Sequence, residues 1–428
     1  MKPEKINRVK GTKDILPPAA ALWREVEEVA REVFELYNFH EIRFPVFEKT
    51  EVFSKSIGDT SDIVEKEMYT FTDRGGESLT LRPEGTASVV RAFVENSLFN
   101  RPGVKKFYYM GPMFRAERPQ AGRFRQFHQI GAEVFGTDDP SADAELILAL
   151  LDFFEALNIT GLELKLNSLG CPVCRPAYRD ELASFLKSRI GSLCESCQRR
   201  VDKNPFRALD CKSKGCKQAV SDAPSIDRFL CGECKDSFQS VQNLLKDAGV
   251  SVTLDPRLVR GLDYYSRTAF EVTSSRLGAQ DAVAGGGRYN SLVEQFGGPP
   301  TPAIGFALGM ERLLTLVDAP ENEPAPDAFL VAVGGEAEKE IFQLARRLRR
   351  DGFMVERGFG GGNLNNRMKK ADKSGARFAV IIGDDEIANA SATIKDLIKG
   401  TQKQVGLDEI PKTLEDDLLA PIEEQSEE

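Results

Sequence analysis

Four arginines lie within eleven residues of one stretch of the chain, and their chemistry suits the binding of a polyanion. The stretch covers residues 107–136 and is typical of two strands flanking a loop, and its arginines are Arg115, Arg118, Arg123 and Arg125. A planar guanidinium binds two phosphate oxygens at once and stacks on purine rings. Charge runs are usually solvated surface, but here Phe114, Phe124 and Phe127 lie among the charges. The composition therefore predicts a nucleoside triphosphate site.

Eight cysteines form a second group with metal-binding chemistry. They make four close pairs, Cys171 with Cys174, Cys194 with Cys197, Cys211 with Cys216 and Cys231 with Cys234. Such pairs fit tetrahedral zinc–thiolate sites, whereas chance burial of cysteines explains a single pair better than four. Proximity groups the middle four in one site with zinc-ribbon spacing and the outer four in another. All-thiolate sites leave no open position, so the predicted role of zinc is structural.

Length, charge and composition set the broad class. A chain of 428 residues predicts two or three domains, and 41% apolar with 29% charged residues describes an ordinary globular protein. Without a run of eighteen apolar residues or an apolar leader, we expect a cytoplasmic protein with no membrane partner. Only His40 and His128 are histidines, which argues against a histidine-ligated metal; we expect His128 to be a packing or hydrogen-bonding neighbour of the site.

Charge is distributed unevenly along the chain. Residues 408–428 carry a net charge of −8 of the total of −9, whereas residues 341–378 carry +7. Local charge governs contact with nucleic acid, so a basic region in a near-neutral body is compatible with RNA binding.

The apolar periodicity indicates how the elements are arranged. Helices are expected at 20–39, 84–93, 142–157 and 238–248. Strands are expected at 40–53, 68–72, 78–81, 162–166, 252–254, 268–272 and 281–284. Pro45 should place the first strand at an edge. We interpret GGGRYN at 285–290 as a turn, and we expect Arg288 and Tyr289 to face the predicted binding pocket. Beyond 327, strands and helices alternate, which predicts an α/β domain with a largely parallel sheet and, at 321–327, a linker before it.

Several of these segments together resemble the class II aminoacyl-tRNA synthetases. FPVFEKTEVF, FRAERPQAGRFRQFHQIGAE and AIGFALGMERL are similar to the three motifs of the class. LVRGLDYYSRTAFEV followed by GGGRYN, with TLRPEGTASVVRAF, is similar to the signature of the histidyl-tRNA synthetase family. The resemblance extends from about Arg8 to Asp408.

The resemblance implies a fold and a division of the chain. The expected fold class is an α+β class II synthetase core, an antiparallel sheet of six strands flanked by helices, with a Cys-rich insert and a C-terminal α/β anticodon-binding domain. We predict a core in two parts, 1–168 and 251–320, interrupted by an insertion domain at 169–250. The anticodon-binding domain is predicted at 328–422, and an acidic tail at 423–428. Because the insert has few large apolar side chains, we expect metal binding to supply much of its folding energy.

The resemblance also assigns site residues. Three arginines are implied as catalytic: Arg115 on the α-phosphate, Arg312 near the γ-phosphate, and Arg260, which contacts both substrates. The remaining ATP-binding residues are Glu117, Arg123 and Phe127. The histidine-binding set is Glu84 and Gln129 for the amino group, Glu133 and Tyr264 for the imidazole, with Gly85, Thr86, Tyr265, Arg115 and Arg260 around them. A carboxylate and a hydroxyl complement the donor and acceptor nitrogens of a neutral imidazole.

The implied activity is histidine–tRNA ligation with ATP and Mg²⁺, tRNA(His) as partner, and a homodimer that packs through the segment around Pro45. Two alternatives remain. One is a histidine-binding regulatory paralogue without ligase activity, which in this family lacks the C-terminal domain and has degraded arginines. The other is a class II synthetase for another amino acid, which Glu133 and the stretch 260–265 oppose.

Overall fold

The computed structural model describes residues 5–58, 61, 63–119, 122–278, 281–318, 325–360 and 363–419. The chain divides into two compact units, Met1–Ala319 and Pro320–Glu428, and each is described by itself. The predicted tail at 423–428 and part of the predicted linker lie outside the described residues, and the predicted domain boundaries stay predictions. Within the described residues, no helix is both long and apolar enough to cross a membrane.

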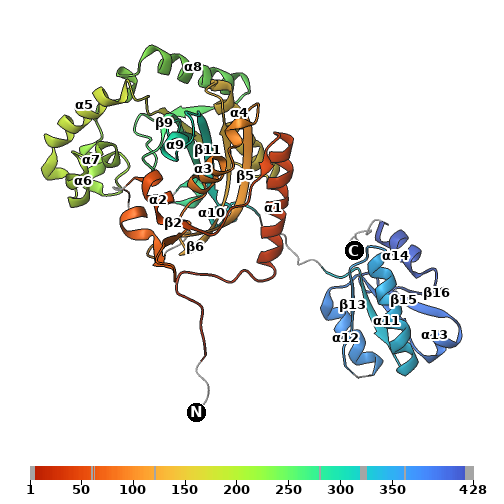
Figure 1. Cartoon of the computed structure of the whole chain (residues 1–428). Coiled ribbons are helices and arrows are strands. Elements are labelled where there is room, and N and C mark those ends of the chain that lie inside the picture. Colours follow the sequence, from red (N-terminus) through yellow and green to blue (C-terminus); the bar gives the residue numbers. More distant parts are fainter. Residues whose placement is uncertain are drawn as a thin grey trace. The chain divides into compact units, whose positions relative to one another are not determined.

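A large mixed sheet forms the centre of the N-terminal unit (Figure 1). Its strands, in spatial order, are β1 (His40–Glu41), β5 (Lys105–Phe114), β6 (Gln126–Phe135), β11 (Ala303–Gly309), β10 (Ala282–Arg288), β9 (Ser266–Ser274), β7 (Leu162–Ser168) and β8 (Val252–Leu254). The six inner strands pair antiparallel, as the resemblance implied, whereas β1 and β8 pair parallel with β5 and β7. The sequence did not predict these two parallel edges.

Helices cover one face of this sheet. They are α1 (Ala19–Leu36), α4 (Pro140–Ala156) and α8 (Gly232–Asp247), which lie beside one another along the sheet in Figure 1. Their apolar stripes bury Phe34, Leu150 and Leu245 in one core with Phe306 of β11. Because neighbouring side chains of a strand point to opposite faces, this leaves the other face for the site.

Smaller elements pack on the opposite face. They are α2 (Thr50–Ile57), η1 (Ile63–Glu67), α3 (Thr86–Glu95), η2 (Leu98–Asn100), α9 (Leu292–Gln295) and a sheet of β2 (Phe47–Lys49), β4 (Ser78–Leu81) and β3 (Tyr69–Thr72). Two further short elements, η6 (Ser275–Leu277) and α10 (Met310–Leu313), add apolar side chains to the core of α1, α4 and α8. The single strand predicted at 40–53 is wrong. The chain pairs only on either side of Pro45, and α2 begins at Thr50. Both short strands do lie at sheet edges, as the proline predicted.

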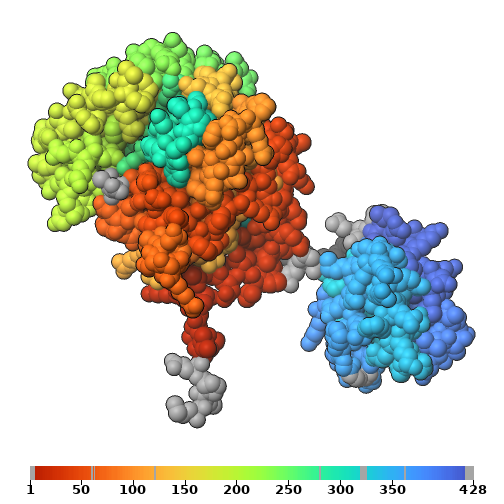
Figure 2. Space-filling model, viewed as in Figure 1, coloured from red at the N-terminus to blue at the C-terminus, as the bar shows by residue number. Residues whose placement is uncertain are grey.

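The insert folds as a lobe of short helices, seen in yellow to green in Figure 2. Its elements are α5 (Arg175–Lys187), η3 (Ile190–Ser192), α6 (Glu195–Arg200), η4 (Pro205–Ala208), α7 (Lys214–Ala219) and η5 (Ile226–Arg228), and it returns through α8. Tyr178, Leu182, Leu186 and Phe206 form a core around the cysteines. The expectation of little core was therefore wrong, because apolar residues spaced far apart in the sequence converge.

The C-terminal unit is a five-stranded sheet with helices. Its strands, in spatial order, are β13 (Val355–Arg357), β12 (Ala328–Ala332), β14 (Phe378–Ile382), β15 (Ser391–Asp396) and β16 (Gln402–Gly406). The helices are α11 (Gly335–Arg350), α12 (Leu364–Ser374), α13 (Asp384–Ala388) and α14 (Ile410–Leu419). The prediction of a largely parallel sheet was wrong. β13, β12 and β14 are parallel, but a hairpin adds β15 and β16 antiparallel.

Candidate functional site

A cavity of about 270 Å³ lies on the sheet face opposite α1, α4 and α8. Its walls come from the start of α3, the loop between β5 and β6, the segment 260–265 and the start of α10, and the strands β6, β10 and β11 also line it. All three predicted catalytic arginines line it, together with the predicted Glu84, Thr86, Glu117, Arg123, Phe127, Gln129, Tyr264 and Tyr265. The fold thus brings together residues that are more than two hundred positions apart in the chain.

Two arginines of the β5–β6 loop form one wall. Arg115 donates from Nε to the carbonyl of Pro83 at 2.9 Å, and its guanidinium lies over the ring of Phe127, 5.1 Å from the centroid. Arg123 pairs with Glu117 at 3.1 Å. These contacts hold the guanidinium groups of both arginines at the rim of the cavity, where a planar cation suits phosphate oxygens.

Arg312 faces them from α10. It donates to the carbonyl of Ala282 at 3.0 Å and lines the same cavity. Burial lowers the pKa of Arg312, and the neighbouring charges of Arg123 and Arg115 lower it further, whereas Glu117 and Glu271 act in the opposite direction. Several cations around one partly buried site favour the binding of a polyanion.

Arg260 lines the cavity where it meets the sheet, against β10. Its Nη1 donates to Glu271 Oε2 at 2.6 Å, and its buried Nε has no hydrogen-bond partner among the described residues. A Cβ at Gly285 would lie 2.1 Å from Arg260 Nη2, so this position must be glycine for the guanidinium to lie flat. The glycines read as a turn are in fact part of β10, and the first of them makes room for a cation.

The start of α3 presents a buried carboxylate. Glu84 accepts from the backbone amides of Thr86 at 2.8 Å and Ala87 at 2.9 Å. Burial raises its pKa, while these amides and the charge of Arg115 act in the opposite direction. Gln129 Oε1 is buried without a hydrogen-bond partner in the described part of the chain. Buried polar atoms without partners are rare, so this acceptor suits a ligand donor.

Glu133 lies below the cavity and is not part of its wall. Its side chain is fully buried and accepts from Thr86 Oγ1 at 2.6 Å and from the Tyr289 hydroxyl at 2.5 Å. Burial raises the pKa of Glu133 to about 8, although both hydrogen bonds lower it. A Cβ at Gly305 would lie 1.5 Å from Glu133 Oε2. The carboxyl group therefore reaches the cavity through Thr86, which does line it. Gly85, at the cap of α3, also lies outside the cavity wall.

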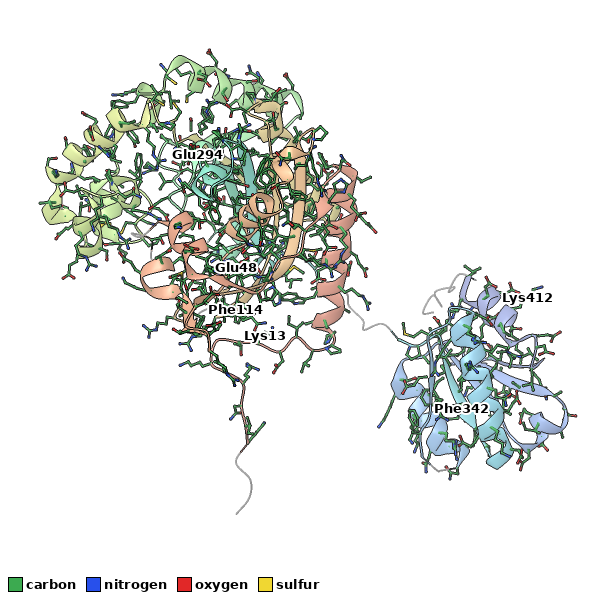
Figure 3. All side chains as sticks on the ribbon, in the orientation of Figure 1. Lys13, Glu48, Phe114, Glu294, Phe342 and Lys412 are labelled. Carbon is green, nitrogen blue, oxygen red and sulfur yellow. The ribbon has the colours of Figure 1, made fainter. Side chains whose placement is uncertain are left out.

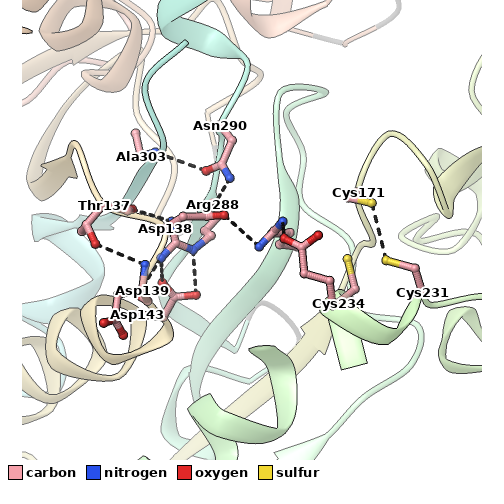
Figure 4. Close-up of polar contacts among 12 residues, drawn as sticks. Thr137, Asp138, Asp139, Asp143, Cys171, Cys231, Cys234, Arg288, Asn290 and Ala303 are labelled. Carbon is pink, nitrogen blue, oxygen red and sulfur yellow. Dashed lines mark hydrogen bonds and ion pairs between the residues drawn. The ribbon is translucent and has the colours of Figure 1, made fainter. Parts of the chain in front are cut away.

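The expectation that Arg288 and Tyr289 face the cavity was wrong. Arg288 is fully buried and points to the start of α4, where it pairs with Asp143 at 2.5 Å and donates to two backbone carbonyls (Figure 4). The charge of Asp143 compensates this buried cation, so Arg288 joins β10 to α4. Tyr289 supports Glu133 from behind.

Some residues of the site were not predicted. Glu271 lies opposite Gly285 in the β9–β10 pair. If residues 285–287 had been interpreted as a strand paired with the preceding one, this position would have been predicted. Glu311 precedes Arg312 and accepts from the backbone amide of His128 at 3.0 Å and from its Nδ1 side at 3.1 Å. The ring of His128 also packs edge-on against Trp23, so its predicted role as a neighbour is confirmed.

The cysteines group as predicted. Two clusters form, one of Cys171, Cys174, Cys231 and Cys234 and one of Cys194, Cys197, Cys211 and Cys216. Within each cluster all four sulfur atoms lie within 4.8 Å of one another. None of the eight forms a disulfide. We call them the proximal and the distal cluster, because the first lies where the insert leaves and rejoins the sheet.

Comparisons with known proteins identify the family. The family model described as histidyl-tRNA synthetase matches residues 11–313, and an anticodon binding domain matches residues 327–417. A histidine–tRNA ligase of Trichlorobacter lovleyi is 52% identical over 94% of this chain and 96% of its own length, and one of Geobacter metallireducens is 51% identical over 94% and 98%. The crystal structure of apo histidyl-tRNA synthetase from S. aureus matches with a TM-score of 0.82 at 35% identity, covering 96% of this chain and all of the other. The chain therefore belongs to the histidyl-tRNA synthetase family.

Proposed function

We propose that this protein is a histidine–tRNA ligase, which activates L-histidine with ATP and transfers it to the 3′ end of tRNA(His), releasing AMP and diphosphate. One observation carries the proposal. Arginines from three separate segments, Arg115, Arg260 and Arg312, line the same cavity as the buried acceptors Glu84 and Gln129. A site with cations on one side and amino-acid acceptors on the other suits an amino acid beside a triphosphate.

The chemistry follows from this arrangement. A carboxylate oxygen of histidine forms a bond to the α-phosphorus, and the bond from that phosphorus to the bridging oxygen breaks, so that diphosphate leaves with the electron pair. Negative charge increases around the α-phosphorus in the transition state, and fixed cations stabilise it without having to reorganise. We assign this stabilisation to Arg115 and Arg260, and contact with the terminal phosphate to Arg312.

Recognition of histidine falls to the deeper wall. Glu84 and Gln129 supply acceptors for the ammonium group, and Tyr264 faces the cavity from the segment that follows Arg260. We propose that Glu133 acts on the imidazole through its hydrogen bond with Thr86. An amino acid that leaves such groups unpaired is rejected by large factors.

The cofactors we propose are Mg²⁺ with the triphosphate and structural zinc in the two cysteine clusters. Mg²⁺ takes oxygen ligands, commonly one or two carboxylates with substrate phosphates. Glu117 and Glu311 are carboxylates in the cavity wall and would hold it. The ion would neutralise part of the phosphate charge.

The C-terminal unit supports tRNA binding. Arg346, Arg349 and Arg350 surround Phe342 on α11, and Phe342, labelled in Figure 3, is 60% exposed. A basic surface with an exposed ring suits a nucleic-acid strand, since cations meet phosphates and a ring stacks on bases. This surface is the one we propose for tRNA contact.

A homodimer and a cytoplasmic location complete the proposal. Val46 and Phe47, at the edge beside Pro45, are 40% and 48% exposed, which suits burial against a second copy. Eight cysteines without disulfides suit a reducing compartment. The regulatory paralogue is not favoured, because the three arginines meet in one cavity and the C-terminal unit is present.

The test is ATP–diphosphate exchange measured with each of the twenty amino acids. We expect exchange to depend on histidine alone. Exchange stimulated by another amino acid would contradict the specificity, and none at all with histidine would contradict the enzyme.

A further inference from the structure

The proximal cluster has the dimensions of a tetrathiolate metal site. Its sulfur–sulfur distances are 3.7 Å for Cys171 and Cys174, 3.8 Å for Cys171 and Cys231, and 3.9 Å for Cys174 and Cys234. A zinc–sulfur bond of about 2.3 Å in a tetrahedron places sulfurs about 3.8 Å apart. A disulfide instead requires about 2.05 Å. The cluster therefore fits an ion and not a covalent bond.

The distal cluster has the same dimensions. Cys194 and Cys211 have their sulfurs 3.8 Å apart. In each cluster a backbone amide points at a sulfur: Cys171 donates to Cys174 Sγ at 3.1 Å, and Cys194 donates to Cys216 Sγ at 3.1 Å. Amide donors of this kind stabilise the negative charge of metal-bound thiolates. Because the insert contains two similar cysteine clusters, a variant that disrupts one cluster can be compared with a variant that disrupts the other.

The proximal cluster borders the segment that forms the histidine wall. Arg175 follows Cys174 directly, and its Nη1 donates to the carbonyl of Tyr265 at 2.9 Å. The guanidinium also lies over the ring of Phe206, 4.6 Å from its centroid. The residue next to a cluster ligand therefore fixes the backbone of a residue that lines the cavity.

A backbone pairing reinforces this contact. The amide of Arg267 donates to the carbonyl of Gly170 at 2.9 Å, and its own carbonyl accepts from Leu169 at 2.6 Å. Arg267 has a φ of 49°, which a residue with a side chain seldom adopts. The Leu169–Gly170 backbone, directly before Cys171, thus holds a strained residue two positions after Tyr265.

The other side of the cluster reaches the same residue. Glu233, between Cys231 and Cys234, forms an ion pair with Arg267. Arg267 also pairs with Asp138 at 3.0 Å, and Asp138 with Arg288 at 3.3 Å, so ion pairs extend from the cluster to the buried Arg288 (Figure 4).

The distal cluster braces the beginning of the same segment. Between its ligands Cys197 and Cys211 the chain carries Arg207, which donates to the carbonyl of Gly261 at 2.6 Å and pairs with Asp263 at 2.8 Å. These two residues lie between Arg260 and Tyr264. The insert therefore contacts the segment at both ends, on the side away from the cavity.

We propose that the two clusters bind one zinc ion each and that these ions, through Arg175, Glu233 and Arg207, position the segment 258–267 for histidine. The inference rests on the proposed function for its substrate. The zinc ions touch no reactant; they hold the wall that carries Arg260, Tyr264 and Tyr265.

The first test measures metal and local order without activity. Elemental analysis of the full-length protein should give two zinc ions per chain, and one in each of Cys231→Ser and Cys211→Ser. Hydrogen–deuterium exchange should then quicken at the Arg267 amide in Cys231→Ser, and near Asp263 in Cys211→Ser. Metal-free protein with eight freely titrating thiols in the folded state would overturn the sites, and so would iron in place of zinc.

The second test separates positioning from folding. Arg175→Gln and Arg207→Gln should retain two zinc ions, yet lower kcat/KM for histidine about tenfold with KM for ATP changed less than twofold. Arg175→Lys should recover part of the loss. Arg189→Gln is the matched control, since Arg189 pairs with Asp222 inside the insert. Unchanged histidine kinetics in Arg175→Gln and Arg207→Gln would overturn the positioning role. Wild-type protein without histidine-dependent exchange would instead refute the proposed function. The zinc content and the hydrogen–deuterium exchange would then decide whether the two zinc sites hold the segment 258–267 in place.

Discussion

The two walls of the cavity are built differently. The phosphate wall consists largely of loop arginines that keep part of their surface exposed, 21% for Arg115 and 39% for Arg123. The histidine wall is buried, with Glu84 3% and Tyr264 4% exposed, and Glu133 directly behind it is 0% exposed. Strands, a helix start and hydrogen bonds hold these deeper groups from several directions.

The difference matches what each substrate requires. A triphosphate offers many equivalent oxygens and strong charge, so long cations at a rim recognise it without tight geometry. A small imidazole is distinguished from other side chains only by groups held in place before it binds. We therefore expect changes in the two walls to separate cleanly in the kinetics, and the predictions below start from the largest effect.

Arg260→Gln should have the largest effect. Its charge is needed most when the α-phosphate is attacked, so kcat for histidine-dependent exchange should fall about 100-fold or more, in the range for loss of one fixed donor. KM for ATP should change little. Pre-steady-state adenylation with varied ATP measures both quantities. A loss confined to KM for ATP would move Arg260 from the reacting phosphate to simple nucleotide binding.

Glu133→Gln should impair the histidine wall alone. The amide keeps the shape of the side chain but changes its hydrogen bonding with Thr86 and Tyr289, so KM for histidine should rise roughly tenfold or more because the wall loses complementary partners. KM for ATP should stay within twofold in the same exchange assay. An equal rise for both substrates would mean that the two walls are not independent and would point to a folding defect.

The sequence predicted which residues form the two walls of the cavity better than it predicted the strands and turns that position them. The loop that carries Arg115 was identified because guanidinium groups have definite chemistry, whereas Gln129 and the other residues around histidine were assigned through the resemblance to the family. Glu133 was expected at the imidazole, but the structure places it behind Thr86. The alternation of side chains along a strand predicts which face of the sheet a residue lies on. It does not predict how deeply the residue is buried beneath that face.

The failures in the fold have similar causes. The alternation of apolar and polar residues around Pro45 did not reveal that strand pairing is interrupted there, because the same alternation continues through backbone that is not hydrogen-bonded to a neighbouring strand. The glycine run of β10 was read as a turn because glycine is typical of turns. In this protein it lies in a strand, where a neighbouring chain segment and Arg260 approach closely. Such contacts depend on residues distant in the sequence.

Substitution of Arg346, Arg349 and Arg350 by Gln should leave both walls unchanged. Removing three positive charges from α11 should raise KM for tRNA about fivefold or more and reduce the salt dependence of binding, since fewer counterions are released. Histidine-dependent exchange, which needs no tRNA, should match wild type. Lys339→Gln, an exposed cation of the same helix paired with Glu336, is the control. A fall in exchange with unchanged tRNA affinity would contradict the assignment of this surface.

The last prediction concerns folding and not kinetics: the Glu133 carboxyl, which lies behind the histidine wall, should make stability depend on pH. Burial raises the pKa of Glu133 to about 8 from the ordinary value of 4.5, so the folded protein favours the neutral carboxyl. Between pH 4.5 and pH 8 the unfolded chain binds fewer protons at Glu133 than the folded protein does. The stability that this carboxyl contributes is therefore fully present below pH 4.5 and is lost as pH rises through 8. Thermal unfolding at pH 5 and pH 8 should therefore show wild type losing stability relative to Glu133→Gln, which has no such proton. Glu294→Gln, an exposed carboxylate labelled in Figure 3, serves as the control and should follow wild type. If wild type and Glu133→Gln changed in parallel with pH, Glu133 would be ionised in the folded state, and burial would not control its protonation.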